Sequence, residues 1–482
     1  MANTGEQVPT GDSGGIKLER PRLTFKEKVG YSLGDMASNL YFQTFVLFLP
    51  IFYTDVFGIP AAAMGTMMLV TRVWDAVTDP VMGMIADRTQ SRWGKFRPYI
   101  ISFAIPLAVG GVLVFSTPDF ADSGKLIYAY ATYMLLMMLY TAINVPYSAL
   151  MGVITPNSME RTEVSSFRFV AAFGGQVIVG AATLGLVEYF GNGDEALGWQ
   201  LTMVAYGALA VALLFATFYL TKERVSPKKE KRNKASADLK DLFMNKPWVL
   251  VGAATLFQLT YIVMRGSSTT YYFRYYVGDQ QMNLLGYNID LTYALFTSSF
   301  ITAGTVATLI GAILTKYFTK LLDKKFVYSG FLISSAAFST TFFFLQPDNV
   351  LLMYVLNVLV SFFFGSVSVL QWAIYTDAAD YGEWKFGRRA TALIMAASLF
   401  MLKLGLTFGG AIVGWMLDFH NFTPNVEQTA DTITGIKLLM SVYPAVFGFI
   451  GGAIMLFYPL RDITMVKIEE DLLARKEEDE EE

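Results

Sequence analysis

Apolar runs of about 20 residues or more recur along nearly the whole chain, and this feature constrains the fold more than any other. A run of that length is what an α-helix needs to cross the hydrocarbon core of a bilayer. The 482 residues are 54% hydrophobic and only 16% charged, a balance that a soluble protein could not bury in ordinary domains. The sequence therefore predicts an all-α polytopic membrane protein.

Twelve membrane-spanning helices are expected, in two bundles of six. Their ranges are 27–52, 61–86, 97–117, 124–152, 165–190, 199–221, 247–277, 291–317, 325–346, 349–381, 390–418 and 435–459. A long loop over 222–246 follows the sixth span, and its Ser, Lys and Glu residues are typical of an exposed linker. This divides the chain into an N-terminal segment (1–26), two six-helix bundles (27–221 and 247–459) and an acidic tail (460–482). Such a layout suits a transporter that binds its solute between two rocking halves.

The Lys and Arg residues of the loops predict the orientation. Basic connections alternate with connections that contain no Lys or Arg, and the basic ones lie near 87–97, 156–164, 222–246, 316–325 and 382–389. Because short cytoplasmic loops carry the excess of Lys and Arg, both termini and the linker are expected to face the cytoplasm. The most plausible membrane is a bacterial inner membrane.

Several classes of protein are disfavoured. The chain has no cysteine, which excludes disulfides, thiolate metal sites and cysteine nucleophiles. His420 is the only histidine, so a Ser–His triad or a transition-metal enzyme would depend on one imidazole. A membrane-embedded transferase would usually carry an acidic or His-rich catalytic loop, and a channel would line a continuous path with polar residues. We therefore expect neither an enzyme nor a nucleic-acid-binding protein, and no cofactor beyond a coupling ion.

The second span carries charges that lipid disfavours, in the stretch Arg72-Val-Trp-Asp75-Ala-Val-Thr-Asp79-Pro80. Each ionised group near a helix centre costs roughly 2.5–3.5 kcal/mol to insert. Asp75 and Asp79 are four residues apart, so they project from one helix face and can share a small cation. The alternative is an internal pair of Arg72 with Asp75 that holds two helices together, which leaves Asp79 unexplained.

Longer motifs carry a family resemblance. They are Tyr31-Ser-Leu-Gly34-Asp35, Trp74-Asp75-Ala-Val-Thr78-Asp79-Pro80, Gly83-Met-Ile-Ala-Asp87-Arg88, Ser91-Arg92-Trp93-Gly94-Lys95, Asn144-Val-Pro146-Tyr147 and Asp380-Tyr381-Gly382-Glu383. With these motifs the chain resembles the glycoside–pentoside–hexuronide:cation symporters of the major facilitator superfamily over nearly all of residues 25–460.

The resemblance implies roles for particular residues. It implies a cation site at Asp75, Thr78, Asp79, Thr141 and Asn144, a sugar site at Asp35, Asn144 and Arg168, and a charge-balancing Lys403. It also implies that the loop charges latch the helix ends on the cytoplasmic side, through Gly83, Asp87, Arg88, Arg92 and Lys95. The alternative for that loop is an ordinary basic connection, which accounts for the Arg and Lys residues but not for the spacing of Gly83 and Asp87.

The residues themselves support most of these roles. Asp35 lies inside the first span, where it can accept sugar hydroxyls or pair with Arg168 or Arg265. Lys403 is flanked by apolar residues, and because a buried ammonium is costly unless paired, we expect it to neutralise Asp75 and Asp79 when the cation leaves. Together with Arg168, Arg265 makes a carboxylate-bearing sugar such as a uronide plausible, since guanidinium binds carboxylate bidentately.

Two positions depart from the family pattern. Asn144 stands where the family's best-known sugar permease has an acid, and Gly34 where it has a lysine. Sodium would then be bound by Asp75, Asp79 and neutral oxygens, or the protein would use protons alone. We predict a monomeric secondary transporter that imports a glycoside, pentoside or uronide with Na⁺ or H⁺ by alternating access. A carrier of lipid-like or amphipathic solutes is the alternative. Such a carrier would need an apolar cleft that contains neither Asp35 nor paired arginines.

Overall fold

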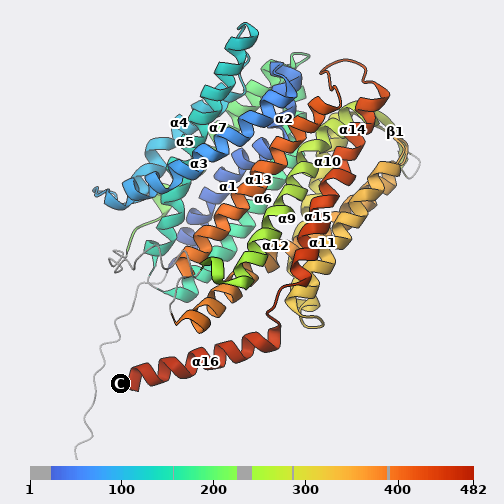
Figure 1. The fold of residues 1–482 in the computed structure, drawn as a ribbon. Coiled ribbons are helices and arrows are strands. Elements are labelled where there is room, and N and C mark those ends of the chain that lie inside the picture. Colours follow the sequence, from blue (N-terminus) through green and yellow to red (C-terminus); the bar gives the residue numbers. More distant parts are fainter. Residues whose placement is uncertain (1–22, 156, 225–241, 285–286, 388–390, 482) are drawn as a thin grey trace, which may run out of the picture.

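The computed structural model describes residues 23–481 except for 156, 225–241, 285–286 and 388–390, and it consists of long helices packed side by side (Figure 1). The predictions made for residues 1–22 and for most of the linker lie outside the described residues. The all-α membrane fold is confirmed.

The first half contains the six expected spans. Its elements are α1 (Phe25–Leu47), α2 (Leu49–Ile51), η1 (Phe52–Phe57), α3 (Ala61–Arg88), α4 (Arg97–Val114), α5 (Asp122–Ile154), α6 (Ser158–Gly191) and α7 (Glu195–Leu220). Local sequence explains where the first helix begins. The Thr24 hydroxyl accepts from the backbone amide of Glu27 at 3.3 Å, and the Glu27 carboxylate accepts from the amide of Thr24 at 2.9 Å. This reciprocal cap satisfies two amides that the helix itself cannot pair.

The second half repeats the arrangement. Its elements are α9 (Lys246–Tyr271), η2 (Tyr272–Val277), β1 (Gln280–Leu284), β2 (Tyr287–Leu291), α10 (Tyr293–Phe318), α11 (Lys324–Thr340), η3 (Thr341–Phe344), α12 (Val350–Phe386), α13 (Thr391–Phe419), α14 (Ala430–Met440), α15 (Val442–Leu456) and α16 (Asp462–Glu481). The antiparallel hairpin of β1 and β2, with Met282 opposite Ile289, lies in a stretch expected to be a plain loop. The tail forms α16, which crosses beneath the bundle in Figure 1.

Among the described residues, ten helical segments are long and apolar enough to cross a membrane, when α9 with η2, α11 with η3 and α14 with α15 are each counted as one segment. The number is eleven when the bent α1–α2–η1 segment is also counted as one span. The twelfth long helix is α3, which has 28 residues. It does not reach the apolarity of those spans, because it carries Arg72, Asp75 and Asp79. The helix that stands out by composition is therefore the one in which the cation site is expected.

Glycines allow the helices to approach one another closely. A Cβ atom on Gly311 of α10 would lie 2.0 Å from the carbonyl oxygen of Phe362, and one on Gly365 of α12 would lie 2.0 Å from that of Thr308. These separations are far below van der Waals contact, so each position requires glycine. Small residues at helix contacts are typical of membrane bundles, where close packing replaces the hydrophobic driving force.

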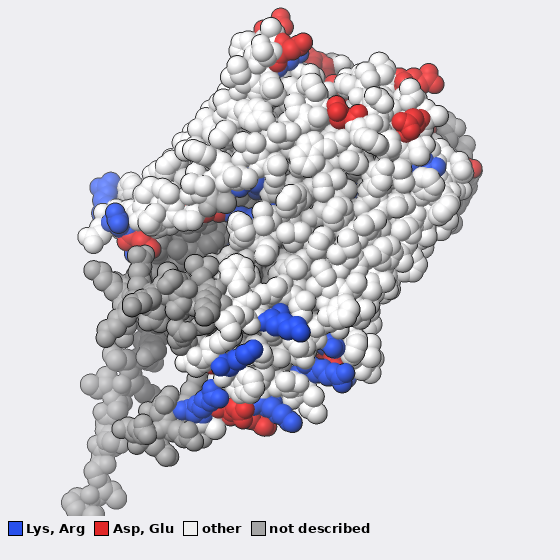
Figure 2. All heavy atoms as spheres, in the orientation of Figure 1, with Lys and Arg blue, Asp and Glu red and all other residues white. Residues whose placement is uncertain are grey.

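The bundle has two ends, which we name by their residues. The linker end carries Lys95, Glu223 and Lys324, and the far end carries Asp55, Glu195, Arg274 and Asn425. Figure 2 shows most charged side chains toward the ends of the visible face, with a broad area between them that is largely uncharged and holds a few basic and acidic groups in a hollow. Such an area is what a bilayer requires of the surface that it covers.

Close contacts between the two halves occur toward the far end. Gly65 of α3 packs on the backbone of α13, where its Cβ would lie 2.6 Å from the carbonyl oxygen of Ala411. On the other side of the bundle, a Cβ on Gly180 of α6 would lie 2.8 Å from Ile301 of α10. The Ser267 hydroxyl of α9 donates to the carbonyl of Val46 in α1 at 2.6 Å. The two halves are thus packed together at the far end.

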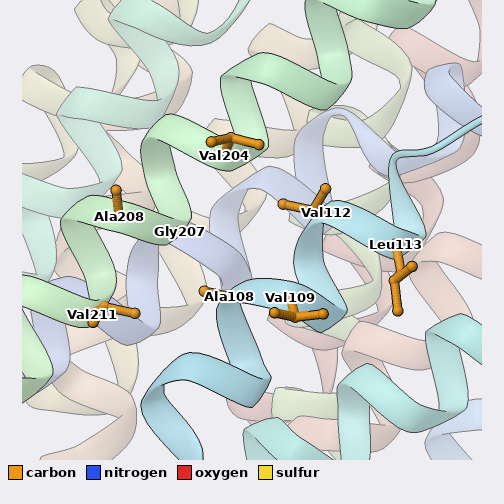
Figure 3. A pocket seen from close by; sticks show the side chains of 8 residues that line it. All are labelled: Ala108, Val109, Val112, Leu113, Val204, Gly207, Ala208 and Val211. Carbon is orange, nitrogen blue, oxygen red and sulfur yellow. The ribbon is translucent and has the colours of Figure 1, made fainter.

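An apolar groove lies between α4 and α7 on the outside of the first half (Figure 3). It is lined by small and branched side chains, among them Ala108, Val109, Val204 and Gly207. The lining offers no side-chain hydrogen-bonding group, so this groove is not suited to bind a sugar.

Candidate functional site

The two acids of α3 have different surroundings. Asp75 is buried, with only 2% of its surface exposed, and one of its carboxylate oxygens lies 3.6 Å from a guanidinium nitrogen of Arg72. The other oxygen, Oδ1, is buried and has no hydrogen-bond partner. Asp79 is partly exposed and accepts a hydrogen bond of 2.9 Å from the Thr141 hydroxyl of α5. The Arg72–Asp75 pair, which was the alternative to a shared cation, is therefore present, and Asp79 is left for other partners.

Lys403 forms an ion pair with Asp79. Because Lys403 belongs to α13 and Asp79 to α3, this pair joins the two halves. The positive charges of Arg72 and Lys403 both act on Asp75 as well. Two acids and two basic groups thus form one cluster without net charge, which lowers the cost of burying them in the membrane.

Thr78 and Asn144, the other two expected cation ligands, turn to different partners. The Thr78 hydroxyl donates to the backbone carbonyl of Asp75 at 3.3 Å, which is an ordinary contact within a helix. The Asn144 side-chain oxygen accepts from the Ser38 hydroxyl of α1 at 2.7 Å, and its amide nitrogen donates to the carbonyl of Tyr140 at 3.0 Å. Asn144 therefore links α5 to α1 and makes no hydrogen bond to either acid.

The structure brings the expected sugar residues Asp35 and Arg168 together. Arg168 donates two hydrogen bonds to the Asp35 carboxylate, from Nε and, at 3.1 Å, from Nη2. The Tyr147 hydroxyl donates to the same carboxylate at 2.8 Å. The side chains of Arg168 and Asp35 are 30% and 16% exposed, so the pair borders accessible space. It can present hydrogen-bond donors and acceptors to a polar solute.

The rings of two tyrosines lie next to the Asp35–Arg168 pair. The rings of Tyr31 and Tyr147 are stacked with centroids 4.7 Å apart, and the Arg168 guanidinium lies 5.7 and 5.6 Å from them. Gly34 is needed for this packing, because a Cβ there would lie 2.4 Å from the Tyr147 ring. The departure from the family pattern at Gly34 thus has a structural reason in this chain.

A short path connects the two clusters. Thr141, which binds Asp79, lies one turn from Asn144 on α5, and Ser38, which binds Asn144, lies one turn from Asp35 on α1. Packing between these helices therefore places the acidic pair and the Asp35–Arg168 pair at opposite ends of one chain of contacts.

Arg265 lies away from the Asp35–Arg168 pair. It is 4% exposed inside the second half, where it donates to the Asn357 side chain at 3.1 Å and lies over the rings of Phe300 and Phe342. The structure brings it neither to Asp35 nor to Arg168. Its expected part in binding an acidic sugar stays a prediction, with no contact in this conformation to support it.

The loop that joins α3 to α4 is fixed within the first half. Lys95 pairs with Asp87 at 3.1 Å, and the Arg92 guanidinium lies 4.7 Å from the ring of Trp93. Arg88 is exposed, and a Cβ on Gly83 would meet only a Val145 methyl group at 3.9 Å.

The sequence did not point to Glu223, the residue that anchors this loop. Its carboxylate accepts from the backbone amides of Lys95, Phe96 and Arg97 at 2.8, 2.8 and 3.0 Å. These amides lie at the start of α4 and just before it, where a helix has unpaired donors and favours negative charge. Gly94 precedes them with φ of 105°, and a Cβ there would lie 2.5 Å from the Glu223 carboxylate.

Ser38, Tyr31 and Tyr147 are three further site residues that were not predicted from the sequence. Ser38 has no signal of its own, because hydroxyl groups are common in these helices. Tyr31 belongs to the motif Tyr31-Ser-Leu-Gly34-Asp35 and Tyr147 to Asn144-Val-Pro146-Tyr147, so membership in these motifs was the available signal.

Fold and site together define the class. Two bundles of apolar helices enclose ion-paired polar groups deep inside the membrane region, and one of these pairs joins the halves. This arrangement is that of a membrane transporter of the major facilitator type.

The comparisons with known proteins give the family. Residues 30–462 match the family described as MFS/sugar transport protein, and the chain belongs to it. The expected relationship to the glycoside–pentoside–hexuronide:cation symporters is confirmed. The chain is a transporter and not an enzyme.

Named relatives resemble the chain over nearly its whole length. The inner membrane symporter YicJ of Escherichia coli (strain K12) is 38% identical over 88% of this chain and 89% of its own. The isoprimeverose transporter of Lactiplantibacillus pentosus is 32% identical over 96% and 93%. The glucuronide carrier protein homolog of Escherichia coli (strain K12) is 30% identical over 94% and 97%.

A solved structure shows the same fold. It is that of a bacterial homolog of the human lysosomal transporter Spinster in an inward-facing, unoccupied conformation. Its TM-score is 0.66, with 15% identity over 92% of this chain and 97% of that one. At this identity the likeness concerns the fold alone.

Proposed function

We propose that the protein imports a sugar, a glycoside, pentoside or uronide, together with Na⁺ or H⁺, by alternating access. The family and the named relatives support sugar and symport as the class of activity. In this proposal Asp75 and Asp79 bind the coupling cation, and Asp35 and Arg168 bind the sugar.

The observation that carries the proposal is the buried, unpartnered Oδ1 of Asp75. A carboxylate oxygen removed from water without a hydrogen bond is costly, so such a group in a native protein requires an explanation, and a bound ion is one of them. A cation or proton at this oxygen removes that cost. Among the described residues, no group of three or more acidic or histidine side chains is placed to hold a metal ion. Sodium would therefore need neutral oxygens in addition to Asp75 and Asp79.

The contacts suggest how the two solutes are coupled. When a cation binds, Lys403 leaves Asp79 and the link between the halves at this depth is released. The release of Asp79 changes its contact with Thr141, and Thr141 lies one turn from Asn144 on α5. Because Asn144 binds Ser38, movement of α5 also moves α1, which carries Asp35. Coupling is reciprocal, so whatever the cation adds to sugar affinity, the sugar adds to cation affinity.

The Lys and Arg residues of the loops support an orientation of the protein in the membrane. The basic loops at the linker end support a cytoplasmic position for that end, with the far end outside. An inner-membrane location accords with the similarity to the inner membrane symporter YicJ. We propose that the transporter acts as a monomer, because each chain contains both halves of the site.

The test is sugar uptake by proteoliposomes that contain the purified protein, under imposed gradients of Na⁺ or H⁺. A neutral glycoside, a pentoside and a uronide are offered separately. We expect one of the two gradients to drive accumulation, and Asp75→Asn and Asp79→Asn to abolish that drive. Asp35→Asn should remove sugar binding itself.

The matched control is Asp119→Asn, which neutralises an exposed acid in the loop between α4 and α5. It should leave accumulation unchanged. Uptake that is indifferent to both gradients would remove symport from the proposal. If only the uronide accumulates, and Arg265→Gln abolishes this accumulation, then Arg265 binds the uronide during transport. This conformation does not show such a role.

A further inference from the structure

The first helix of each half ends in the same unusual way. The segment that begins with α1 finishes in the π-helical turn η1, and α9 finishes in the π-helical turn η2. Each turn is closed by a glycine with positive φ, 80° at Gly58 and 67° at Gly278. π-helical turns are rare and occur often at functional sites. Two of them at corresponding places in the two halves form a repeated element at the far end.

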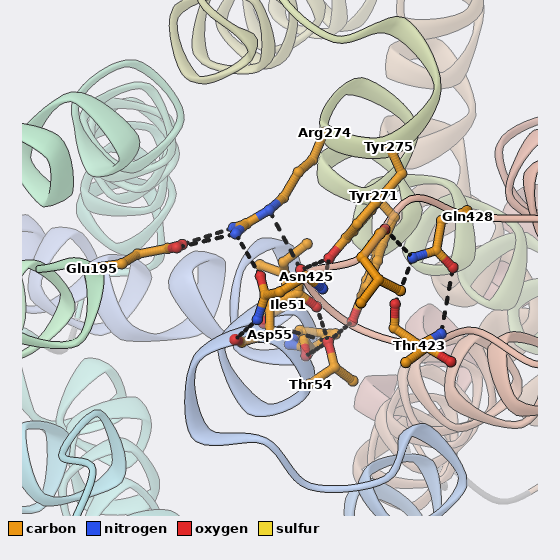
Figure 4. Close-up of polar contacts among 12 residues, drawn as sticks. Ile51, Thr54, Asp55, Glu195, Tyr271, Arg274, Tyr275, Thr423, Asn425 and Gln428 are labelled. Carbon is orange, nitrogen blue, oxygen red and sulfur yellow. Dashed lines mark hydrogen bonds and ion pairs between the residues drawn. The ribbon is translucent and has the colours of Figure 1, made fainter. Parts of the chain in front are cut away.

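The two turns bind each other. The Asp55 carboxylate of η1 accepts a hydrogen bond from the Tyr275 hydroxyl of η2 and lies 3.5 Å from Nε of Arg274 (Figure 4). The neighbouring Thr54 hydroxyl is 2.8 Å from the Tyr271 hydroxyl at the end of α9. The Asp55 side chain is completely buried. A buried carboxylate in the first half is therefore neutralised by groups of the second half.

A second acid shares the same arginine. Arg274 donates to the two carboxylate oxygens of Glu195, the first residue of α7, at 2.8 and 3.1 Å. Figure 4 shows the guanidinium between Glu195 and the Asp55 turn. Bidentate pairs of this kind have a strict geometry and are among the stronger ion pairs. One basic side chain of the second half thus holds two acids of the first.

Asn425, in the connection between α13 and α14, closes the cluster. Its backbone amide donates to the Tyr275 hydroxyl at 3.0 Å, and its side chain donates to the carbonyl of Asp55 at 2.6 Å and accepts from Arg274 at 3.0 Å. Its φ is 59°, a left-handed conformation that asparagine tolerates better than most residues. This conformation allows all three contacts to be made at once.

We propose that Asp55, Glu195, Arg274, Tyr275 and Asn425 form a lock that holds the far end closed and opens as a unit. Separation of the halves would leave the Asp55 carboxylate without its tyrosine and arginine, so partial opening is disfavoured. Full opening brings water to both acids and removes that cost. The lock therefore gives the transporter two discrete states at this end rather than a continuum.

The inference rests on transport by two rocking halves but not on which sugar or cation is carried. Lys403 and Asp79 join the halves deeper in the membrane, where the coupling cation is proposed to act. The lock involves neither residue. Its test therefore needs no solute, and its outcome is separate from that of the uptake experiment.

The chain has no cysteine, so labels can be placed without first removing any. Leu197→Cys and Val426→Cys place spin labels on exposed positions of the two halves at the far end. In a second protein, Tyr219→Cys and Phe326→Cys do the same at the linker end. Distance distributions are measured by double electron–electron resonance on protein in lipid nanodiscs, without sugar and at constant Na⁺ and pH.

With the lock intact, we expect a short far-end distance to dominate. Arg274→Gln and Tyr275→Phe should each raise the ratio of far-end-open to far-end-closed molecules, Arg274→Gln by at least about tenfold, which is ~1.4 kcal/mol. The linker-end distance should shorten in the same proportion of molecules. Tyr275→Phe keeps the ring and the charges, so it supplies a result if loss of the arginine prevents folding.

The matched control is Asp431→Asn, which removes an acid 3.7 Å from His420 at the same end but within the second half. It should leave both distributions unchanged. Unchanged distributions in Arg274→Gln and Tyr275→Phe would overturn the lock. So would a longer far-end distance without a shorter linker-end distance, because that result would mean local loosening and no rocking of the halves.

Discussion

Replacement of Lys403 by glutamine tests whether a lysine of the second half competes with the coupling cation for Asp79. The ion pair exists in the structure, and the Lys403 and Asp79 side chains are 36% and 23% exposed. At a separation of about 4 Å and an effective dielectric constant of about 20, two opposite charges attract by about 4 kcal/mol. Solvent screening and the entropy of fixing a lysine side chain reduce the net value to roughly 1–2 kcal/mol.

Because the cation must displace the lysine, removal of this competitor should tighten cation binding by the same amount. The concentration of Na⁺ or H⁺ that gives half-maximal sugar binding is expected to fall by about 5- to 30-fold in Lys403→Gln. Isothermal titration of the detergent-purified protein with sugar, repeated over a series of cation concentrations, measures this value. Net uptake should slow relative to sugar exchange. Net uptake requires the empty carrier to return, and in Lys403→Gln the Asp79 carboxylate of the empty carrier has no lysine to neutralise it.

Lys437→Gln is the control. Lys437 also belongs to the second half, but its ammonium lies over the rings of Tyr276 and Phe343. It should leave the cation dependence of sugar binding within about twofold of the original, a change of no more than ~0.4 kcal/mol. Weaker or unchanged cation binding in folded Lys403→Gln would refute competition and make the lysine a structural partner of the site.

Three further outcomes are expected. Gly94→Ala should lower the unfolding temperature in detergent, since the left-handed backbone alone costs a non-glycine residue about 1–2 kcal/mol and the new Cβ would displace Glu223; an unchanged temperature would contradict this account of the loop. Tyr147→Phe should weaken sugar binding by about tenfold, because Asp35 loses a hydrogen bond worth about 1–1.5 kcal/mol while the ring stack is kept; equal affinity in a titration would place the sugar elsewhere. Gly365→Ala should destabilise by roughly 2–4 kcal/mol through overpacking, whereas Gly330→Ala, with open space around it, should not; equal unfolding temperatures would contradict the close approach of α10 and α12.

The sequence predicted most of the helices and the acidic pair because the bilayer acts on local composition. Each span must satisfy its own backbone hydrogen bonds and bury its own apolar side chains, so length and hydropathy are read directly from the chain. Asp75 and Asp79 stand out for the same reason, as charges where lipid allows few. The hairpin of β1 and β2 was not predicted, since it lies outside the membrane segments where this constraint does not act.

The partners of the charged side chains depend on helix rotation and tilt, which hydropathy does not contain. The sequence left Asp35 free to pair with Arg168 or Arg265, and only the packing of α1 on α6 decides for Arg168. Arg265 instead turns into the second half toward Asn357, because α10 and α12 approach it there. Glu223 and Gly94 meet for a similar reason, at a point where two loops are brought together by α4 and α7.

By itself the sequence determined a multi-pass transporter with charges at the membrane midplane, because lipid imposes those features on each segment separately. The tertiary structure alone decided that Lys403 reaches Asp79 across the two halves and that Arg274 holds both Asp55 and Glu195. Those contacts join residues far apart in the chain, and they form only when glycines such as Gly65 let helices of opposite halves approach closely.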